Sequence, residues 1–120
     1  MFINFSNHPS SMWGEEQLRV ASEYGEIKDF SFPQIEPEAS SDDISSLADE
    51  FYEKLSSMIG RDSESVVHIM GEQNFTYALT TRLRNAGITC LASTTVRDTK
   101  EFPDGKKVST FKFVRFREYE

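Results

Sequence analysis

Hydrophobic and polar residues follow two different periods along this chain, and the changes between them predict its elements. Apolar residues at three- and four-residue spacing run from Ile44 to Ile59, which predicts an amphipathic helix. Residues 66–70 form a short, nearly continuous apolar run, typical of a strand buried on both faces of a parallel sheet. The same reasoning predicts strands at residues 1–6, 27–32, 90–99 and 108–117, and helices at residues 12–24, 42–59 and 75–86.

Capping and turn residues mark the ends of these elements. Ser11 is expected to cap the first helix, with Glu15 and Glu16 in its first turn. Asp42 or a neighbouring Ser should cap the second helix. The third helix has no usual capping residue at its start, and Asn74 could serve one turn late. Residues 102–106 read as the turn of a C-terminal hairpin.

The resulting order, β-α-β-α-β-α-β-β, predicts an α/β fold. We expect a Rossmann-like three-layer sandwich over residues 1–120 as one domain. Its sheet should be mostly parallel, with an antiparallel C-terminal edge strand and helices on both faces. In such sheets ligands bind beyond the carboxyl ends of the strands, where the strand order reverses. That point should lie between the first strand and residues 66–70.

Composition and charge narrow the classes of function. The chain has 120 residues and a net charge of −7, which argues against broad binding of duplex nucleic acid. No run approaches the length of a membrane span, and residues 1–5 read as a strand rather than a signal peptide. A lone cysteine fits a reducing, cytoplasmic setting. Two His and one Cys at wide spacing give no zinc pattern, so neither a metal nor another cofactor is expected.

Three loops follow strands at the expected ligand-binding edge. The first could hold phosphate near a helix start, and His8 could transfer a proton. In the second, a glycine after a buried strand allows close approach of a ligand, and Glu72 could act as a base or bond a ribose or adenine. The third offers hydroxyls and one cation. The candidates are His8 and Arg97 for catalysis, and Asn7, Ser10, Ser11, Gly71, Glu72, Gln73, Thr76, Ser93, Thr94 and Thr95 for ligand binding.

Each candidate also has a purely structural interpretation. The serines could only cap a helix, and His8 could be an idle loop residue. Glu72 could be a first-turn acid favoured by the helix dipole, and the threonines could belong to an edge strand. His68 and Cys90 lie inside buried strands, which favours packing roles for both. The second loop is neither a dinucleotide-binding glycine motif nor a P-loop.

Two stretches of the chain resemble small CRISPR-associated proteins of the CARF type. The first is Val67-His68-Ile69-Met70-Gly71-Glu72 with the following helix and residues 87–95. The second is the opening Asn4-Phe5-Ser6-Asn7-His8-Pro9-Ser10, which resembles the start of short stand-alone members. The resemblance implies a homodimeric Rossmann-like protein that binds cyclic oligoadenylates, the second messengers of type III CRISPR systems. Stand-alone members often act as ring nucleases, which cleave the messenger without metal through its own 2′-hydroxyl.

On this resemblance, His8 would transfer the proton and Arg97 would stabilise phosphate charge. Asn7, Ser10 and Ser11 would hold phosphate and ribose, and Glu72, Gln73 and Thr76 would contact adenine or ribose. The chain is shorter than most CARF domains and carries no effector domain. Three functions therefore stay open at this point: a ring nuclease, a non-catalytic sensor or sequestering module, and an interaction protein whose segment from Phe111 to Phe116 pairs with a partner.

Overall fold

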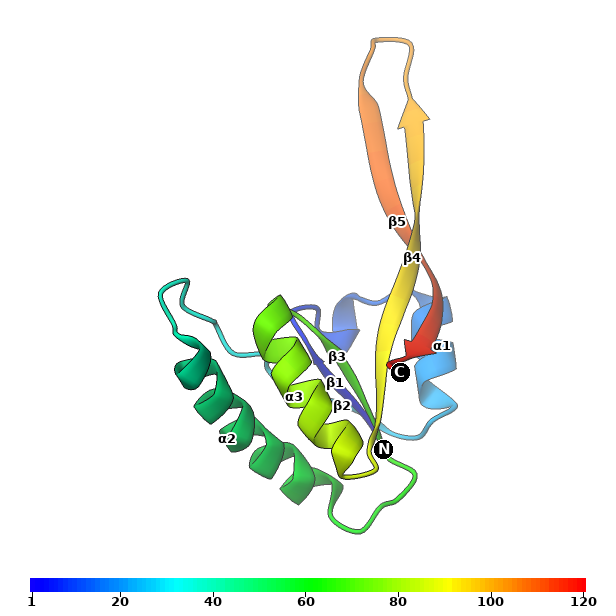
Figure 1. The fold of residues 1–120 in the computed structure, drawn as a ribbon. Helices are drawn as coiled ribbons and strands as arrows, with labels where there is room; N and C mark the ends of the chain where they lie inside the picture. Colours follow the sequence, from blue (N-terminus) through cyan, green and yellow to red (C-terminus); the bar gives the residue numbers. More distant parts are fainter.

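The computed structural model describes residues 1–120 as one five-stranded sheet flanked by three helices (Figure 1). In chain order the elements are β1 (Phe2–Ser6), a 3₁₀ helix (Ser10–Met12), α1 (Glu15–Ser22), β2 (Ile27–Asp29), α2 (Ser41–Ile59), β3 (Val66–Met70), α3 (Gln73–Asn85), β4 (Thr89–Glu101) and β5 (Lys107–Glu118). The α/β class and the order of elements predicted from the sequence are confirmed.

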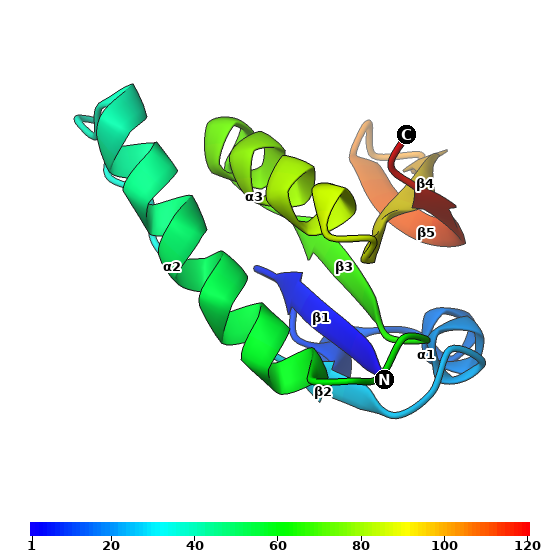
Figure 2. The same cartoon turned by 60° about the horizontal axis from the view of Figure 1, so that its bottom comes forward.

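The strands lie in the order β2-β1-β3-β4-β5. The first three pairings are parallel, and only β4 and β5 run antiparallel. The chain leaves β1 first toward β2 and later returns on its other side as β3, so the strand order reverses at β1. Helices α2 and α3 lie over one face of the sheet and α1 lies over the other (Figure 2). The three-layer arrangement and the position of the switch point are as predicted.

Strand β1 is buried along its whole length and divides its side chains between two environments. Ile3 and Phe5 point to the face under α2 and α3, where they join the larger apolar core. Phe2 points to the α1 face, where it packs with Ala21, Val66 and Leu91. Asn4 and Ser6 alternate with the core residues, so two polar side chains are buried on the α1 face.

The second helix begins with a complete capping box. Ser40 accepts a hydrogen bond from the backbone N–H of Asp43, and the Asp43 carboxylate accepts one from the N–H of Ser40. The helix ends before Gly60, as predicted. Helix α3 begins earlier than expected because the Glu72 carboxylate caps it, accepting from the N–H of Phe75 at 2.7 Å. Asn74 is therefore not the cap.

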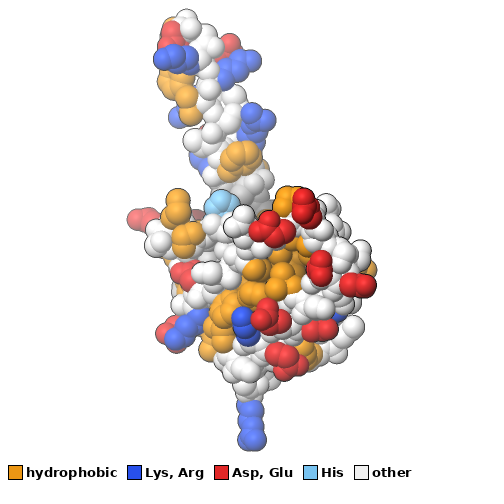
Figure 3. Space-filling model, turned by 90° about the vertical axis from the view of Figure 1, so that its left-hand side faces the viewer, with side chains coloured by type: hydrophobic (Ala, Val, Ile, Leu, Met, Phe, Trp, Pro, Cys, Tyr) orange, Lys and Arg blue, Asp and Glu red, His pale blue; other side chains and the backbone are white.

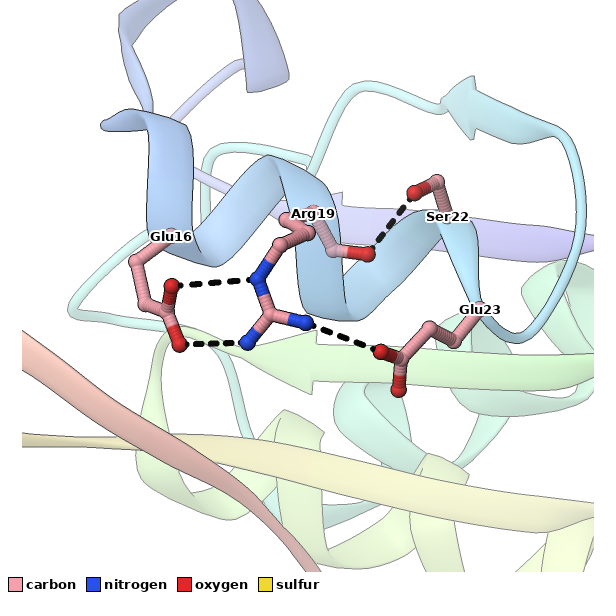
Figure 4. A network of polar contacts seen from close by, with 4 residues as sticks. All are labelled: Glu16, Arg19, Ser22 and Glu23. Atoms are coloured by element: carbon pink, nitrogen blue, oxygen red, sulfur yellow. Dashed lines mark hydrogen bonds and ion pairs between the residues drawn. The ribbon is translucent and has the colours of Figure 1, made fainter.

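The first helix is shorter than predicted, and Ser11 does not cap it. Residues 10–12 form a separate 3₁₀ turn, and α1 starts at Glu15 after Gly14 with no side-chain cap. On its exposed surface Arg19 pairs with Glu16 at 2.7 Å and with Glu23 at 3.0 Å (Figure 4). Solvent screens such exposed pairs, so they add little to the stability of the fold.

Strand β2 is shorter than predicted, and β4 and β5 are slightly longer. The predicted strand at residues 27–32 ends at Asp29, because Phe30 and Phe32 turn inward and pack on the Phe5 ring. Strands β4 and β5 pair as predicted, but their outer parts leave the body as a projecting two-stranded arm, here defined as residues 96–114 (Figure 1). A register shift between Thr94 and Thr95 lies just before the arm.

No helix is long and apolar enough to cross a membrane.

Candidate functional site

An open cavity of about 850 Å³ lies at the carboxyl ends of β1 and β3, where the strand order reverses, and beside the middle of β4. Its walls come from the loop after β1, the start of α1, the end of β3, and the base of the arm. This is the place that the topology predicted, and the volume lies in the usual range for small-molecule sites.

The cavity gathers five of the sequence-predicted residues. Asn7 and His8 come from the loop after β1 and Gly71 from the turn after β3. Ser93 and Thr95 lie within strand β4, so the third predicted loop is part of a strand. Segments far apart in the sequence therefore converge on one hollow. Thr95 is exposed, whereas Ser93 is half-buried.

Other predicted residues are engaged elsewhere. Ser10 donates its hydroxyl and its backbone N–H to the Asp29 carboxylate, and Ser11 is exposed outside the cavity. Glu72 caps α3, which is the structural interpretation of that residue. The Thr94 hydroxyl donates to the carbonyl oxygen of Arg115.

Arg97 lies on the arm rather than in the cavity. Its guanidinium donates to the hydroxyl of Ser109 on β5 at 3.1 and 3.2 Å. The cation that does line the cavity is Lys112, whose ammonium lies 3.6 Å from the Asp98 carboxylate. The expectation that His8, Glu72 and Arg97 share one pocket is therefore wrong, because two of the three side chains have structural partners outside it.

Gln73 and Thr76 line a second, smaller cavity of about 530 Å³ along α3. Met70 and Gly71 border both cavities, so the two hollows adjoin at the end of β3. A β-carbon at Gly71 would overlap the ring of Phe32. The glycine is therefore explained by packing, whether or not a ligand approaches it.

Asn4 is buried and is the centre of a polar network that runs from exposed Asp29 to residues lining the cavity. Its amide nitrogen donates to the Asp29 carboxylate and to the backbone carbonyl of His8, both at 2.8 Å. Its amide oxygen accepts from the hydroxyl of Ser6 and faces Nδ1 of His68 at 2.9 Å. On the far side of the ring, Nε2 of His68 lies 3.2 Å from the Ser93 hydroxyl. The network therefore crosses the sheet from β2 to β4.

The environment sets the charges within this network. Burial lowers the pKa of His68 to about 4, and the neighbouring His8 acts in the same direction, so the buried ring is neutral near pH 7. Burial raises the pKa of Asp29, but hydrogen bonds from Asn4 and Ser10 outweigh it and hold that pKa below its ordinary value. Burial also raises the pKa of the Cys90 thiol to about 12, which agrees with its predicted packing role.

The neutral state of His68 predicts that stability falls as the pH falls. The unfolded chain binds a proton near the ordinary value of 6.5, whereas the folded chain binds it only near 4. Unfolding is therefore favoured progressively between these values, by up to about 3 kcal/mol. Urea unfolding at about pH 7.5 and about pH 4.5 measures this loss. His68→Gln should reduce the pH dependence; an equal slope in both proteins would contradict the assignment.

Four residues of the site were not among the candidates from the sequence. Asn4 and His68 lie in buried strands. Trp13, just before α1, and Lys112, on the arm, line the cavity. The alternation of Asn4 and Ser6 with core residues on β1 is a signal that could have found the network, since buried polar residues need partners. Nothing local in the sequence shows that Lys112 lines the cavity.

The charge around the cavity is mixed. The first turn of α1 supplies the side chains of Glu15 and Glu16, and its backbone N–H groups start without a side-chain cap. Glu16 is paired with Arg19, whereas Glu15 has no ion pair. Lys112 and His8 contribute the positive or titratable groups. No cluster of three His, Cys, Asp or Glu side chains is arranged to hold a metal ion.

The fold and this cavity define a three-layer α/β protein with a hollow of ligand size at its switch point. The model of the uncharacterized protein MJ1673 family matches residues 1–117, and the chain therefore belongs to that family. No curated protein and no solved structure matches the chain.

Proposed function

We propose that this protein binds cyclic oligoadenylates in the cavity at the switch point and cleaves them without a metal ion. The observation that carries the proposal is the convergence of His8, Ser93 and the uncapped start of α1 on one hollow. A helix start with free N–H groups favours phosphate, and His can move a proton near neutral pH. The resemblance to stand-alone CARF-type proteins supplies the chemical class of ligand.

In the proposed reaction a 2′-hydroxyl of the ring attacks the adjacent phosphorus. The 2′-oxygen–phosphorus bond forms, the bond from phosphorus to the 5′-oxygen breaks, and a 2′,3′-cyclic phosphate and a 5′-hydroxyl result. His8 accepts the proton of the 2′-hydroxyl as the new bond forms and passes it to the departing 5′-oxygen, so the protons balance. The protein otherwise aligns the groups, which is where much of such catalysis originates.

Individual contacts follow from where the side chains lie. Asn7 and Thr95 would contact phosphate or ribose inside the cavity. Lys112 would stabilise the phosphate charge, the role that the resemblance gave to Arg97. Gln73 and Thr76 would contact the part of the ligand that extends over Gly71 into the adjoining cavity. Two copies related as in CARF dimers would offer two such cavities to one ring, and a homodimer in the cytoplasm is part of the proposal.

One observation favours a second candidate function, that of an interaction protein. Five of the nine large hydrophobic side chains that are exposed lie on the arm: Val96, Phe102, Val108, Phe111 and Val114. The arm carries five Lys or Arg and three Asp or Glu. The rest of the chain carries eight Lys or Arg and 17 Asp or Glu. Figure 3 shows basic side chains on the arm and acidic ones bordering an apolar patch on the body. Isolated two-stranded ribbons are only marginally stable, so a partner could cover the arm.

The deciding experiment incubates purified protein with labelled cyclic tetra- and hexa-adenylate, with and without EDTA, and with linear tetra-adenylate as the control. Trp13 is the single tryptophan and lines the cavity, so its fluorescence reports ligand binding directly. We expect saturable binding of one cyclic ligand and its cleavage in EDTA.

The other outcomes separate the alternatives. Binding without cleavage identifies a sensor or sequestering module. A ligand at 100 times its dissociation constant should add about 2.7 kcal/mol to the free energy of unfolding. No fluorescence change and no thermal shift with any cyclic ligand would exclude the nucleotide proposal, and would leave the interaction function of the arm.

A further inference from the structure

The hydrogen bonds of the network around Asn4 determine which atoms in it donate and which accept. Asn4 faces the Asp29 carboxylate and the carbonyl oxygen of His8 at 2.8 Å, and both can only accept. The amide nitrogen of Asn4 must therefore point to them, which leaves its oxygen facing Nδ1 of His68. Since an amide oxygen only accepts, Nδ1 of His68 carries the proton.

The neutral ring has one proton, so Nε2 of His68 carries a lone pair. The Ser93 hydroxyl has two acceptors beside it, Nε2 of His68 at 3.2 Å and the sulfur of Met70 at 3.1 Å, so its single hydrogen is donated within the chain, and the ring nitrogen is the stronger acceptor. The sulfur of Met70, 3.1 Å from the same oxygen, cannot donate in return. The lone pairs of Ser93 are thus left without a donor from the chain, at the edge of the cavity.

We infer that Ser93 is an obligate hydrogen-bond acceptor in the cavity and that it binds the 2′-hydroxyl of the ligand ribose. The residues Asp29, Asn4 and His68 act as positioning residues, because they fix the direction of the Ser93 hydroxyl without touching the ligand. This inference rests on the proposed function for the identity of the ligand. The direction of the hydrogen bonds follows from the network and from the neutral state of the buried His68 ring.

An acceptor at this position has a direct chemical use. A ribose hydroxyl is the one donor that the proposed reaction must orient, because its oxygen attacks phosphorus. In the bound state, a hydrogen bond from the 2′-hydroxyl to Ser93 would hold the ribose oxygen with its lone pairs toward the phosphate. The proton would then pass to His8, on the loop after β1, as the new bond to phosphorus forms. A ligand with only acceptor groups at this position would find no donor in Ser93.

The first measurement is the tautomer of His68, obtained by NMR of the ¹⁵N-labelled ring. We expect a proton on Nδ1 and none on Nε2 in the folded protein. A proton on Nε2 would overturn the inference, because Ser93 would then accept from His68 and be free to donate to the ligand. This test needs no ligand and no variant.

The second measurement is a cycle of affinities read from Trp13 fluorescence. The ligands are cyclic tetra-adenylate and its 2′-deoxy analogue, and the proteins are the natural chain, Ser93→Ala and Ser93→Thr. Loss of the 2′-hydroxyl should weaken binding to the natural chain by about three- to tenfold, as expected for one hydrogen bond. The same change should have no effect on Ser93→Ala, and Ser93→Thr should restore the difference.

The outcomes distinguish this inference from the proposed function. The ratio of the affinity for cyclic tetra-adenylate to the affinity for its 2′-deoxy analogue is the quantity compared. An equal ratio in the natural chain and in Ser93→Ala would overturn the role of Ser93 while leaving ligand binding established. Binding of neither ligand to the natural chain would overturn the proposed function and the ribose assignment together. Thr99→Val, whose hydroxyl bonds Ser109 on the arm, is the matched control and should keep the ratio of the natural chain.

Discussion

Replacement of His8 by alanine should reduce the rate of ring cleavage by about 10²- to 10⁴-fold, the usual contribution of a general acid or base. The His8 side chain lines the cavity, while its backbone is held below by Asn4 and Ser6. Truncation of the imidazole therefore removes the proton-transfer group and leaves the loop in place. The affinity for cyclic tetra-adenylate should change by less than about threefold, since the expected loss is in the transition state.

Single-turnover cleavage with excess protein measures the rate, and Trp13 fluorescence measures the affinity in the same samples. Lys100→Ala, an exposed change near the end of the arm, is the control and should leave both quantities unchanged. If His8→Ala cleaved at the natural rate, His8 would have no part in the chemistry. If it lost affinity and rate equally, it would be a binding residue instead.

The sequence predicts the frame of this protein well because each main element depends on a short-range pattern. Residues 66–70 could only be a buried strand, and the capping box before α2 lies within four residues of chain. From the alternation of strands and helices, connection rules then give the parallel sheet and its switch point. Three segments were predicted as loops on that basis. The cavity lies where they meet, but the third of them is part of strand β4.

The partners of individual side chains could not be predicted in the same way. Glu72 looked available for a ligand, but its carboxylate returns to the N–H of Phe75 in its own helix. Arg97 looked near the site in sequence, but the register of β4 on β5 carries it onto the arm beside Ser109. Both outcomes depend on geometry that the residue types leave open.

His68 shows a different reason for an incomplete prediction. Its position in a buried strand correctly predicts a core histidine, and it is 2% exposed. Yet burial does not separate a side chain from function, because hydrogen bonds extend its influence to Ser93 at the cavity. The partner of its other nitrogen is Asn4, 64 residues away in sequence and opposite it in the parallel register.

Replacement of Asn4 by alanine should lower the free energy of unfolding by about 3–5 kcal/mol. Asn4 is 2% exposed, and its amide satisfies the Asp29 carboxylate, Nδ1 of His68 and the carbonyl oxygen of His8. Alanine fills none of these roles. The buried partners that lose a hydrogen bond are Nδ1 of His68 and the Ser6 hydroxyl, and each buried group left unpaired costs about 1–3 kcal/mol. Asp29 and His8 are exposed, so their share of the loss is smaller. Because small proteins are stable by about 5–15 kcal/mol, this one change would remove a large part of the total.

Urea unfolding monitored by Trp13 fluorescence tests this expectation, with Asn7→Ala as the matched control. Asn7 lies three residues further on but is exposed, so its loss should change stability by less than about 0.5 kcal/mol. A loss below about 1 kcal/mol in Asn4→Ala would mean that the network across the sheet contributes little. Where the variant still folds, cleavage should also slow, because the His8 carbonyl has lost the shorter of its two hydrogen bonds and keeps only the one from the Ser6 hydroxyl. One buried amide thus links the stability of the sheet to the geometry of the proposed site.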